Sequence, residues 1–84
     1  MISIIVPCYN CEDTIDRCVE SILNQTTKKY EIVLVNDGSV DKTGEICDKY
    51  SKEDERIKVV HQENRGLMAA WKHGVQLATG EYII

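Results

Sequence analysis

Eighty-four residues with 43% hydrophobic content, 29% charged content and a net charge of −4 are typical of one small soluble domain, or of part of a larger one. The acidic balance argues against nucleic acid or an anionic membrane surface as a partner, and no stretch approaches the roughly 20 apolar residues of a membrane span. Residues 1–7 lack the basic start of a signal peptide, so we expect a cytoplasmic protein, or one attached to the cytosolic face of a membrane.

The first part of the chain predicts a strand followed by a helix. Residues 2–6 are apolar on both faces, as in a strand buried in a parallel sheet, and Pro7 is expected to end that strand. Polar residues 24–27 are expected to end the helix that follows. Its inward face, read from the helical spacing of apolar residues, carries Ile15, Cys18, Val19, Ile22 and Leu23.

A second strand and helix come next. Residues 31–35 form another continuous apolar run, which is expected to break at the dense turn signal of residues 36–39. Asp41 or Thr43 is placed to cap the helix that follows. The inward face of this helix carries Ile46, Cys47 and Tyr50.

The last part of the chain repeats the pattern. Residues 57–60 predict a short third strand, and Gly80 is a stop signal for a third helix, after which a fourth strand begins at Glu81. The inward face of the third helix is expected to carry Leu67, Ala70, Trp71, Gly74, Val75 and Ala78. This alternation predicts an α/β fold: a Rossmann-like open parallel sheet of three βα units plus the start of a fourth strand, with right-handed crossovers.

Four cysteines allow more than one interpretation. Cys8 and Cys11 form a C-x-x-C motif directly after a strand, as in thioredoxin-like redox sites. Cys18 and Cys47 fall on apolar helical faces, where a free cysteine behaves as a small hydrophobic residue. Because a second ligand pair at zinc-site spacing is missing from the sequence, we expect four free thiols in a reducing compartment.

Polar clusters follow each of the first three strands, and ligands of open α/β sheets bind at such strand ends. The clusters are residues 7–12, residues 36–39 and residues 63–66, the last of which leads into a helix N-terminus that attracts anions. Asp37 can accept a hydrogen bond from a base N–H or a ribose hydroxyl, and Tyr9 offers a flat face for a base. The strand ends therefore predict a nucleotide site.

Charged residues near the same strand ends could serve the phosphates of such a ligand. Arg65 and Lys72 are candidates for that contact. Each candidate also has a plain structural alternative: residues 37–39 can be only a tight turn, and the two cations can be surface charges. His61 and His73 are expected to lie half-exposed near the ends of elements.

Five segments, in order and in register, closely resemble the family 2 glycosyltransferases. They are residues 4–12 (IIVPCYNCE), 21–26 (SILNQT), 31–43 (EIVLVNDGSVDKT), 63–66 (ENRG) and 78–83 (ATGEYI). The resemblance covers essentially all 84 residues and implies a GT-A fold with the strand order 3-2-1-4. Residues 1–84 are then the N-terminal, nucleotide-sugar-binding part of a glycosyltransferase domain.

The resemblance also implies a reaction and a set of binding residues. The reaction is transfer of a sugar from a nucleotide-sugar donor, usually a UDP-sugar, to a hydroxyl of a saccharide, lipid or protein acceptor, with inversion. In this family the residues matching Pro7, Tyr9 and Glu12 line the nucleotide pocket, and the acid matching Asp37 contacts the uracil. The substrate-binding residues that we expect are Pro7, Tyr9, Asn10, Glu12, Asp37, Gly38, Ser39, Arg65 and Lys72.

The sequence departs from the family pattern in two ways. Trp71 occupies the position of a family arginine, so a cationic contact with the diphosphate would fall to Lys72 or Arg65. The Asp-x-Asp motif that holds Mn²⁺ or Mg²⁺ is expected just after Ile84 and the general base later still, so these 84 residues should be inactive alone. The fourth strand, residues 81–84, would then be an exposed edge, through which we expect a homodimer.

Other classes of α/β protein share this alternation of strands and helices. A dinucleotide-binding dehydrogenase needs G-x-G-x-x-G where this chain has residues 7–12. A receiver-like domain could use Asp37 as its phosphorylated residue, but it needs an acidic pair where Pro7 and Cys8 stand. Nothing in the sequence excludes a non-catalytic or degenerate nucleotide-binding module of the same fold.

Overall fold

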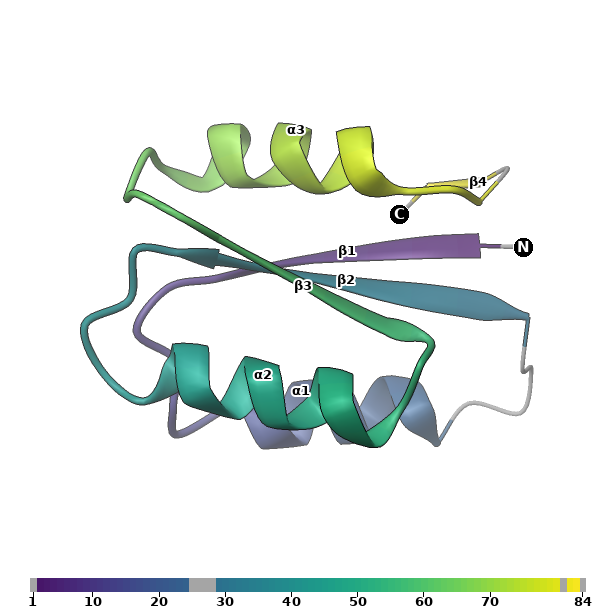
Figure 1. The fold of residues 1–84 in the computed structure, drawn as a ribbon, viewed down its shortest axis with the longest axis horizontal. Helices are drawn as coiled ribbons and strands as arrows, with labels where there is room; N and C mark the ends of the chain where they lie inside the picture. Colours follow the sequence, from purple (N-terminus) through teal and green to yellow (C-terminus); the bar gives the residue numbers. More distant parts are fainter. Residues whose placement is uncertain (1, 25–28, 81, 84) are drawn as a thin grey trace.

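The computed structural model describes residues 2–24 and 29–80, and the backbone of residues 82–83. Strands and helices alternate as β1 (Ile2–Cys8), α1 (Ile15–Leu23), β2 (Tyr30–Asp37), α2 (Thr43–Glu53), β3 (Ile57–Gln62), α3 (Leu67–Leu77) and β4 (Tyr82–Ile83). The paired strands are parallel and follow the order β3-β2-β1-β4 (Figure 1). The open parallel α/β sheet predicted from the sequence is confirmed for the three strand-and-helix units.

Helices cover both faces of the sheet, with α3 on one face and α1 and α2 on the other (Figure 1). β2 lies between β1 and β3, and every one of its residues is buried. Because successive side chains of a strand point to opposite faces, Ile32 and Leu34 pack towards α1 and α2, whereas Val33 and Val35 pack towards α3. This alternation decides which strand-end residues meet α3.

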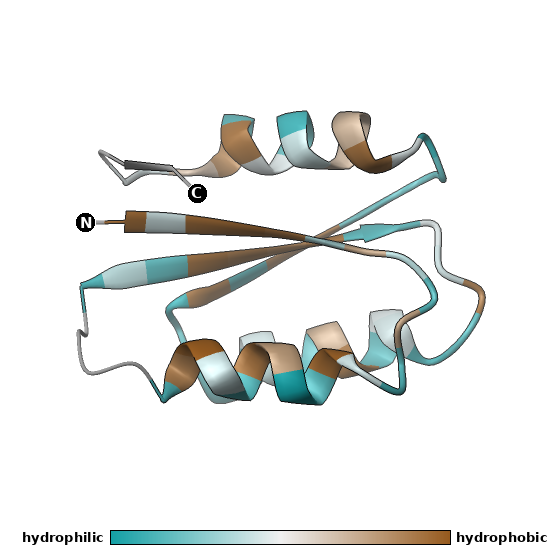
Figure 2. Ribbon diagram, turned by 180° about the vertical axis from the view of Figure 1, so that it is seen from behind, coloured by the Kyte–Doolittle hydropathy of each residue, from teal (hydrophilic) through white to brown (hydrophobic). Residues whose placement is uncertain are grey.

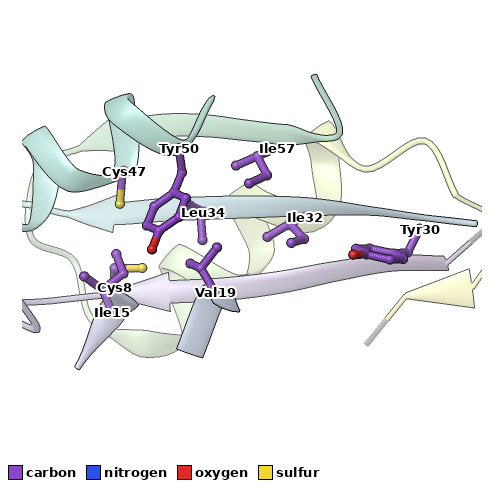
Figure 3. Packing of buried hydrophobic residues seen from close by; sticks show 9 residues of the cluster. All are labelled: Cys8, Ile15, Val19, Tyr30, Ile32, Leu34, Cys47, Tyr50 and Ile57. Carbon is purple, nitrogen blue, oxygen red and sulfur yellow. The ribbon is translucent and has the colours of Figure 1, made fainter. Parts of the chain in front are cut away.

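The larger core lies between the sheet and the helices α1 and α2 (Figure 3). Its buried members are Cys8, Ile15, Val19, Tyr30, Ile32, Leu34, Cys47, Tyr50 and Ile57. A smaller core under α3 consists of Ile5, Val33, Val35 and Ala70. Colouring by hydropathy places hydrophobic residues along the middle of the strands and hydrophilic residues in much of the connecting loops (Figure 2). The polar strand ends are therefore the part of the sheet open to a ligand.

β1 runs through Pro7 to Cys8, so the prediction that Pro7 ends the strand is wrong. The backbone N–H of Ile2 donates to the carbonyl oxygen of Lys29, and alternate residues of a strand direct their N–H groups to the same side. The nitrogen of Pro7 therefore faces away from β2, and the proline ring costs no hydrogen bond in that pair of strands.

β2 and β3 also extend two residues beyond their predicted ends. β2 includes Asn36 and Asp37, and β3 includes His61 and Gln62. In the parallel register Asn36 pairs with His61 and Asp37 pairs with Gln62. Strand pairing thus overrides the local turn propensity of Asn and Asp, and it brings these polar side chains to one edge of the sheet.

The inward face of α1 is narrower than the apolar pattern predicted. Ile15 and Val19 are buried, whereas Cys18 is exposed. One residue of an α-helix turns by about 100°, so a position next to a buried residue can point to solvent. The prediction that Cys18 faces the core is wrong.

The inward face of α3 is formed by its small residues. Ala70 and Gly74 are buried, whereas Leu67 is 70% exposed and Trp71 is 40% exposed. A Cβ added at Gly74 would lie 2.4 Å from Cγ2 of Ile5, so the helix backbone lies almost directly on β1. Such a close approach leaves no room for large side chains underneath, and the predicted core position of Trp71 is wrong.

Two predicted boundaries fall partly outside the described residues. α1 ends at Leu23 with Asn24 as its C-cap, and the remaining residues of the predicted polar stop, 25–27, lie outside. The predicted start and end of the fourth strand, Glu81 and Ile84, also lie outside. In the described parts of the chain, no helix combines the length and apolar character needed to cross a membrane.

Candidate functional site

A pocket of about 320 Å³ opens where β1 and β2 end and α3 begins. Its lining residues are Pro7, Cys8, Tyr9, Asp37, Asn64, Gly66, Leu67 and Ala70. Pro7 follows Ile5 and Asp37 follows Val35 by two residues, so both lie on the face of the sheet that α3 covers. The volume falls in the range of small-molecule sites, about 300–1,000 Å³. Three predicted binding residues, Pro7, Tyr9 and Asp37, therefore line a single pocket.

The carboxylate of Asp37, a residue that is 5% exposed, belongs to this lining. Its Oδ1 accepts hydrogen bonds from Gln62 Nε2 and the Arg65 N–H, both at 2.8 Å, and its Oδ2 accepts from the Gly66 N–H at 3.0 Å. These donors, of which Gln62 contributes most, hold the pKa of Asp37 below its ordinary value. Burial acts in the opposite direction and raises the pKa, but its effect is smaller. The side chain is therefore an anion at neutral pH, and these bonds occupy three of its roughly four acceptor positions.

The turn after β2 lies directly against the loop between β3 and α3. Gly38 has a φ of +68°, and a Cβ at this residue would lie 2.5 Å from the backbone nitrogen of Asn64. The Asn64 Nδ2 group also donates to the carbonyl oxygen of Asp37 at 3.1 Å. Glycine is therefore required at this position both by the backbone conformation and by the contact between the two loops.

The loops after β1 and β2 are joined by hydrogen bonds between side chains and backbone. The Asn10 N–H donates to Ser39 Oγ at 3.0 Å, and Asn10 Oδ1 accepts from the Val40 N–H at 2.9 Å. Glu12 forms a second two-way link with residues 41–42, through distances of 3.2 and 3.3 Å. Three predicted binding residues, Asn10, Glu12 and Ser39, thus use their side chains to hold the pocket's loops together.

Asp41 and Thr43 complete this connection at the start of α2. The carboxylate of Asp41 accepts the Thr43 N–H at 2.9 Å, and the Thr43 hydroxyl accepts the Cys11 N–H at 2.8 Å. The N-cap of α2 is Lys42, without a side-chain cap bond, so the prediction that Asp41 or Thr43 caps this helix is wrong. Asp41, one residue before the cap, still binds one of the free N–H groups of the first helical turn.

His61 supports the same turn from the α2 side of the sheet. Its Nε2 lies 2.9 Å from Asp48 Oδ1, and its Nδ1 lies 2.9 Å from Asn36 Nδ2. Because a carboxylate only accepts, Nε2 carries the proton and Nδ1 accepts from the amide of Asn36. The Asn36 Oδ1 in turn accepts the Ser39 N–H at 3.2 Å, so His61 fixes the strand-end turn.

Arg65 and Lys72 are not brought to the pocket of Asp37. They line a separate depression of about 590 Å³ beside the end of β3 and the outer side of α3. The other residues of this depression are Gln62, Glu63, Ala69, His73 and Gln76. Only the backbone N–H of Arg65 reaches Asp37 among the contacts of these two cations that the structure describes.

Trp71 lies on the pocket side of α3 instead. Together with Pro7, Leu67 and Met68 it lines an apolar hollow of about 440 Å³, which shares Pro7 and Leu67 with the pocket of Asp37. The position that the family resemblance gives to an arginine thus faces this apolar hollow, and the next residue, Lys72, is rotated by about 100° to the other side.

Gln62, which donates to Asp37, was missed by the sequence reasoning. Gln62 follows Val60, a residue packed under α3, by two positions, so strand alternation assigns it to the same face as Asp37. Strand alternation could therefore have identified Gln62, but only if the predicted strand, residues 57–60, had been extended to Gln62.

Within the described residues, no three His, Cys, Asp or Glu side chains come together as a group that could hold a metal ion. The family resemblance implies that the ligands of Mn²⁺ or Mg²⁺ follow Ile84, so the described residues do not test that site. No step of the chemistry is assigned to a metal in this chain.

A parallel α/β sheet with an apolar-walled, carboxylate-containing pocket at its strand ends is the arrangement of a nucleotide-binding domain. The family model described as Glycosyl transferase family 2 matches residues 3–84. The chain belongs to this family.

Two curated relatives are about 50% identical to this chain over nearly its whole length. EpsJ of Bacillus subtilis, described as an uncharacterized glycosyltransferase, is 51% identical over 83 residues, which are 99% of this chain and 24% of the relative. The glycosyltransferase GlyG of Streptococcus pneumoniae is 50% identical over 84 residues, which are 99% of this chain and 28% of the relative. The chain thus spans about a quarter of the length of these relatives.

Solved structures share the fold. S. aureus TarS in complex with UDP-GlcNAc has a TM-score of 0.88 and 31% identity, with 99% of this chain and 25% of that chain covered. The mannosyltransferase PcManGT of Pyrobaculum calidifontis in complex with GDP-Man and Mn²⁺ has a TM-score of 0.88 and 28% identity, with 98% and 25% covered. The architecture described above is therefore that of the GT-A glycosyltransferases.

Proposed function

We propose that this chain forms the nucleotide-binding part of a glycosyltransferase that transfers a sugar from a UDP-sugar to an acceptor hydroxyl with inversion. The observation that carries the proposal is the ionised Asp37 carboxylate in the lining of the strand-end pocket. A carboxylate with one acceptor position left suits the imide N–H of uracil, which is a neutral hydrogen-bond donor.

The walls of the pocket suit the rest of a nucleoside. Tyr9 is 53% exposed beside Asp37, so its ring is available for stacking on a base. The adjoining apolar hollow lined by Trp71 and Leu67 offers surface to the ribose or to the donor sugar, although it offers no cation to the diphosphate. We therefore expect the base and ribose to supply most of the binding free energy.

A divalent cation on the donor diphosphate, Mn²⁺ or Mg²⁺, belongs to the same proposal. PcManGT holds Mn²⁺ with its GDP-Man. The ligands of such an ion would lie outside the described residues of this chain, since those residues form no metal-binding group.

The test is a nucleotide titration of the isotopically labelled chain, followed by NMR. UDP and uridine should shift backbone amides of the loops around Pro7, Tyr9 and Asp37, with a Kd near 1 mM, or about −4 kcal/mol. Asp37→Asn keeps the size of the side chain but replaces its acceptor oxygen pair, and it should weaken UDP binding at least about tenfold.

The control variant is Glu20→Gln, which removes an exposed acid from α1 and should leave the UDP shifts unchanged. GDP and ADP report on base selectivity, because guanine also carries a ring N–H donor whereas adenine does not. Equal shifts with ADP and UDP, or full UDP binding by Asp37→Asn, would show that Asp37 does not select the base.

A further inference from the structure

We infer that Gln62 and His73 are positioning residues, which act through Asp37 to hold its carboxylate in the direction and charge state that nucleotide binding requires. The inference rests on the proposed function, because it concerns the same carboxylate. Neither residue contacts the pocket of Asp37 as a lining residue. Both line the polar depression on the other side of the loop between β3 and α3.

A chain of hydrogen bonds joins that depression to the pocket. Gln62 Nε2 donates to Asp37 Oδ1 at 2.8 Å, and Gln62 Oε1 lies 2.7 Å from His73 Nδ1. Gln62 is the last residue of β3 and His73 lies in the middle of α3, so one amide connects strand and helix across this edge of the site. Both Gln62 and His73 are half-buried, which shields the bonds from competing water.

Simple donor and acceptor rules fix the direction of every bond in the chain. The pKa of Asp37 is held below its ordinary value, so its ionised oxygens only accept and the nitrogen of the Gln62 amide must face them. The amide oxygen then faces His73, and the ring nitrogen Nδ1 must carry a proton. His73 is therefore the Nδ1–H tautomer when neutral, and protonation at Nε2 leaves this bond intact.

The consequence is that His73 holds the Gln62 amide in the orientation in which its nitrogen meets the carboxylate. Without the Nδ1 donor, Gln62 Oε1 loses its partner and the side chain is held less firmly, which weakens the bond that contributes most to the low pKa of Asp37. Arg65 and Gly66 still bind the carboxylate through their backbone N–H groups. We therefore expect weaker base recognition without loss of the fold.

The experiment follows the carboxyl carbon of Asp37 by ¹³C NMR during a pH titration of the ligand-free chain, and UDP affinity in parallel. The variants are Gln62→Leu, His73→Leu and His73→Asn, and the last of these places an amide N–H close to the position of the imidazole Nδ1–H. Gln76→Leu is the matched control, because Gln76 lines the same depression one turn along α3.

Gln62→Leu and His73→Leu should move the titration midpoint of Asp37 upwards and weaken UDP binding about three- to tenfold, the range of one hydrogen bond of ordinary strength. His73→Asn should restore both properties, and Gln76→Leu should change neither. An unmoved Asp37 midpoint in both leucine variants, or identical behaviour of His73→Leu and His73→Asn, would overturn the inference. If Gln62→Leu unfolds, the two His73 variants decide the question.

UDP binding by the wild-type chain tests the proposed function, and the ligand-free titration of Asp37 tests the positioning role independently. A wild-type chain that binds no UDP would overturn the proposed function, while the ligand-free titration of Asp37 still decides the positioning role. A chain that binds UDP through Asp37 but whose leucine variants match wild type would overturn the positioning role alone.

Discussion

Cys8 illustrates how strongly the surroundings of a single residue set its chemistry in this fold. It is 2% exposed at the end of β1, it donates its S–H to the carbonyl oxygen of Val6 at 3.3 Å, and Cys47 belongs to the same core cluster (Figure 3). The Cys47 thiol and burial both raise the pKa of Cys8. Because the thiolate is the reactive form, we expect Cys8 to be unreactive in the folded chain although it belongs to a C-x-x-C motif.

We therefore expect the four cysteines, which are all free, to react in a fixed order with iodoacetamide. Cys18 is exposed and should react first, Cys11 is half-buried and should follow, and Cys8 and Cys47 should react only after unfolding. Mass spectrometry after timed labelling, with and without denaturant, measures this order. Rapid labelling of Cys8 in the folded chain, or a Cys8–Cys11 disulfide under non-reducing conditions, would contradict it.

At the scale of elements, the position of α3 determines what the pocket can contain. Gly74 and Ala70 allow the helix to lie almost on β1 and β2, and this depth brings Leu67 and the loop before it to the strand ends. Small residues at a helix interface do not contribute much buried area themselves. Their contribution is the close approach, which a larger side chain would prevent.

Gly74→Ala tests this role, because two effects of the substitution oppose each other. In an exposed helix the change should stabilise the protein by about 1 kcal/mol through helix propensity. In this chain the new Cβ would lie 2.4 Å from Ile5 Cγ2 and 3.1 Å from Val35 Cγ2, so we expect net destabilisation of about 1–3 kcal/mol in urea unfolding.

A double-mutant cycle identifies the clash as the cause. Ile5→Ala removes the atom that the new Cβ would meet, so Gly74→Ala should cost less in that background than in wild type. Additive costs of the two substitutions, or a stabilised Gly74→Ala variant, would show that α3 does not lie as close to β1 as described.

The elements and their order were predictable from the sequence for a physical reason. Strands of a parallel sheet are covered on both faces, so they appear as continuous apolar runs, and the helices between them show one apolar stripe. The neighbourhood of Pro7, Tyr9 and Asp37 followed from the same logic, since the carboxyl ends of neighbouring parallel strands meet at one edge. These three residues share a pocket in the structure.

The rotation of α3 was predictable only in part, because Ala70 and Gly74 are buried as expected whereas Leu67 and Trp71, also expected on the inward face, are exposed. Placing Lys72 in the depression beside β3 and Trp71 at the apolar hollow depends on which side of the helix meets the sheet. That choice is made by small residues, Ala70 and Gly74, which carry little hydrophobic signal. The apolar pattern was therefore dominated by the large residues Leu67 and Trp71, which it wrongly assigned to the inward face.

At the scale of the whole molecule, β4 is an outer strand among the described residues, paired with β1 at Ile2 and Ser3. An outer strand presents N–H and C=O groups that can pair with another chain. We predict self-association as a two-fold dimer through this edge, and sedimentation velocity at several concentrations should show it.

Ile83→Lys should shift the dimer towards monomer, because an edge charge opposes strand pairing. Val40→Lys is the control, since Val40 is 88% exposed in the loop after β2, at the opposite end of the sheet. A monomer at all concentrations, or a dimer that is indifferent to Ile83→Lys, would exclude pairing through β4.

One buried carboxylate ties the end of the sheet where β1 and β2 begin to the segment after α3. Glu31 Oε2 accepts from Ser3 Oγ at 2.6 Å and from both the N–H and the hydroxyl of Thr79 at 2.7 Å. Glu31 Oε1 lies 2.8 Å from Lys58 Nζ, and the Gly80 N–H donates to Ser3 Oγ at 2.8 Å. Residues from β1, β2, β3 and the segment before β4 thus meet at a single side chain.

Glu31 therefore makes the stability of the whole molecule depend on acid pH. Burial raises the pKa of Glu31, but the bonds from Lys58, Ser3 and Thr79 outweigh burial and lower the pKa from 4.5 to about 2. Since the folded state binds the proton less tightly than the unfolded state, the stabilisation is fully present above about pH 4.5 and is lost as the pH falls towards about 2.

Glu31→Gln should lower the free energy of urea unfolding by about 1–3 kcal/mol at neutral pH, because it removes a charged acceptor that several donors share. The difference from wild type should shrink between about pH 4.5 and pH 2, where the wild-type carboxylate itself becomes protonated. Glu20→Gln, which alters an exposed glutamate on α1, should follow wild type at every pH. If Glu31→Gln and wild type instead differed by a constant amount across the acid range, the buried carboxylate would not be the group through which acid weakens the fold.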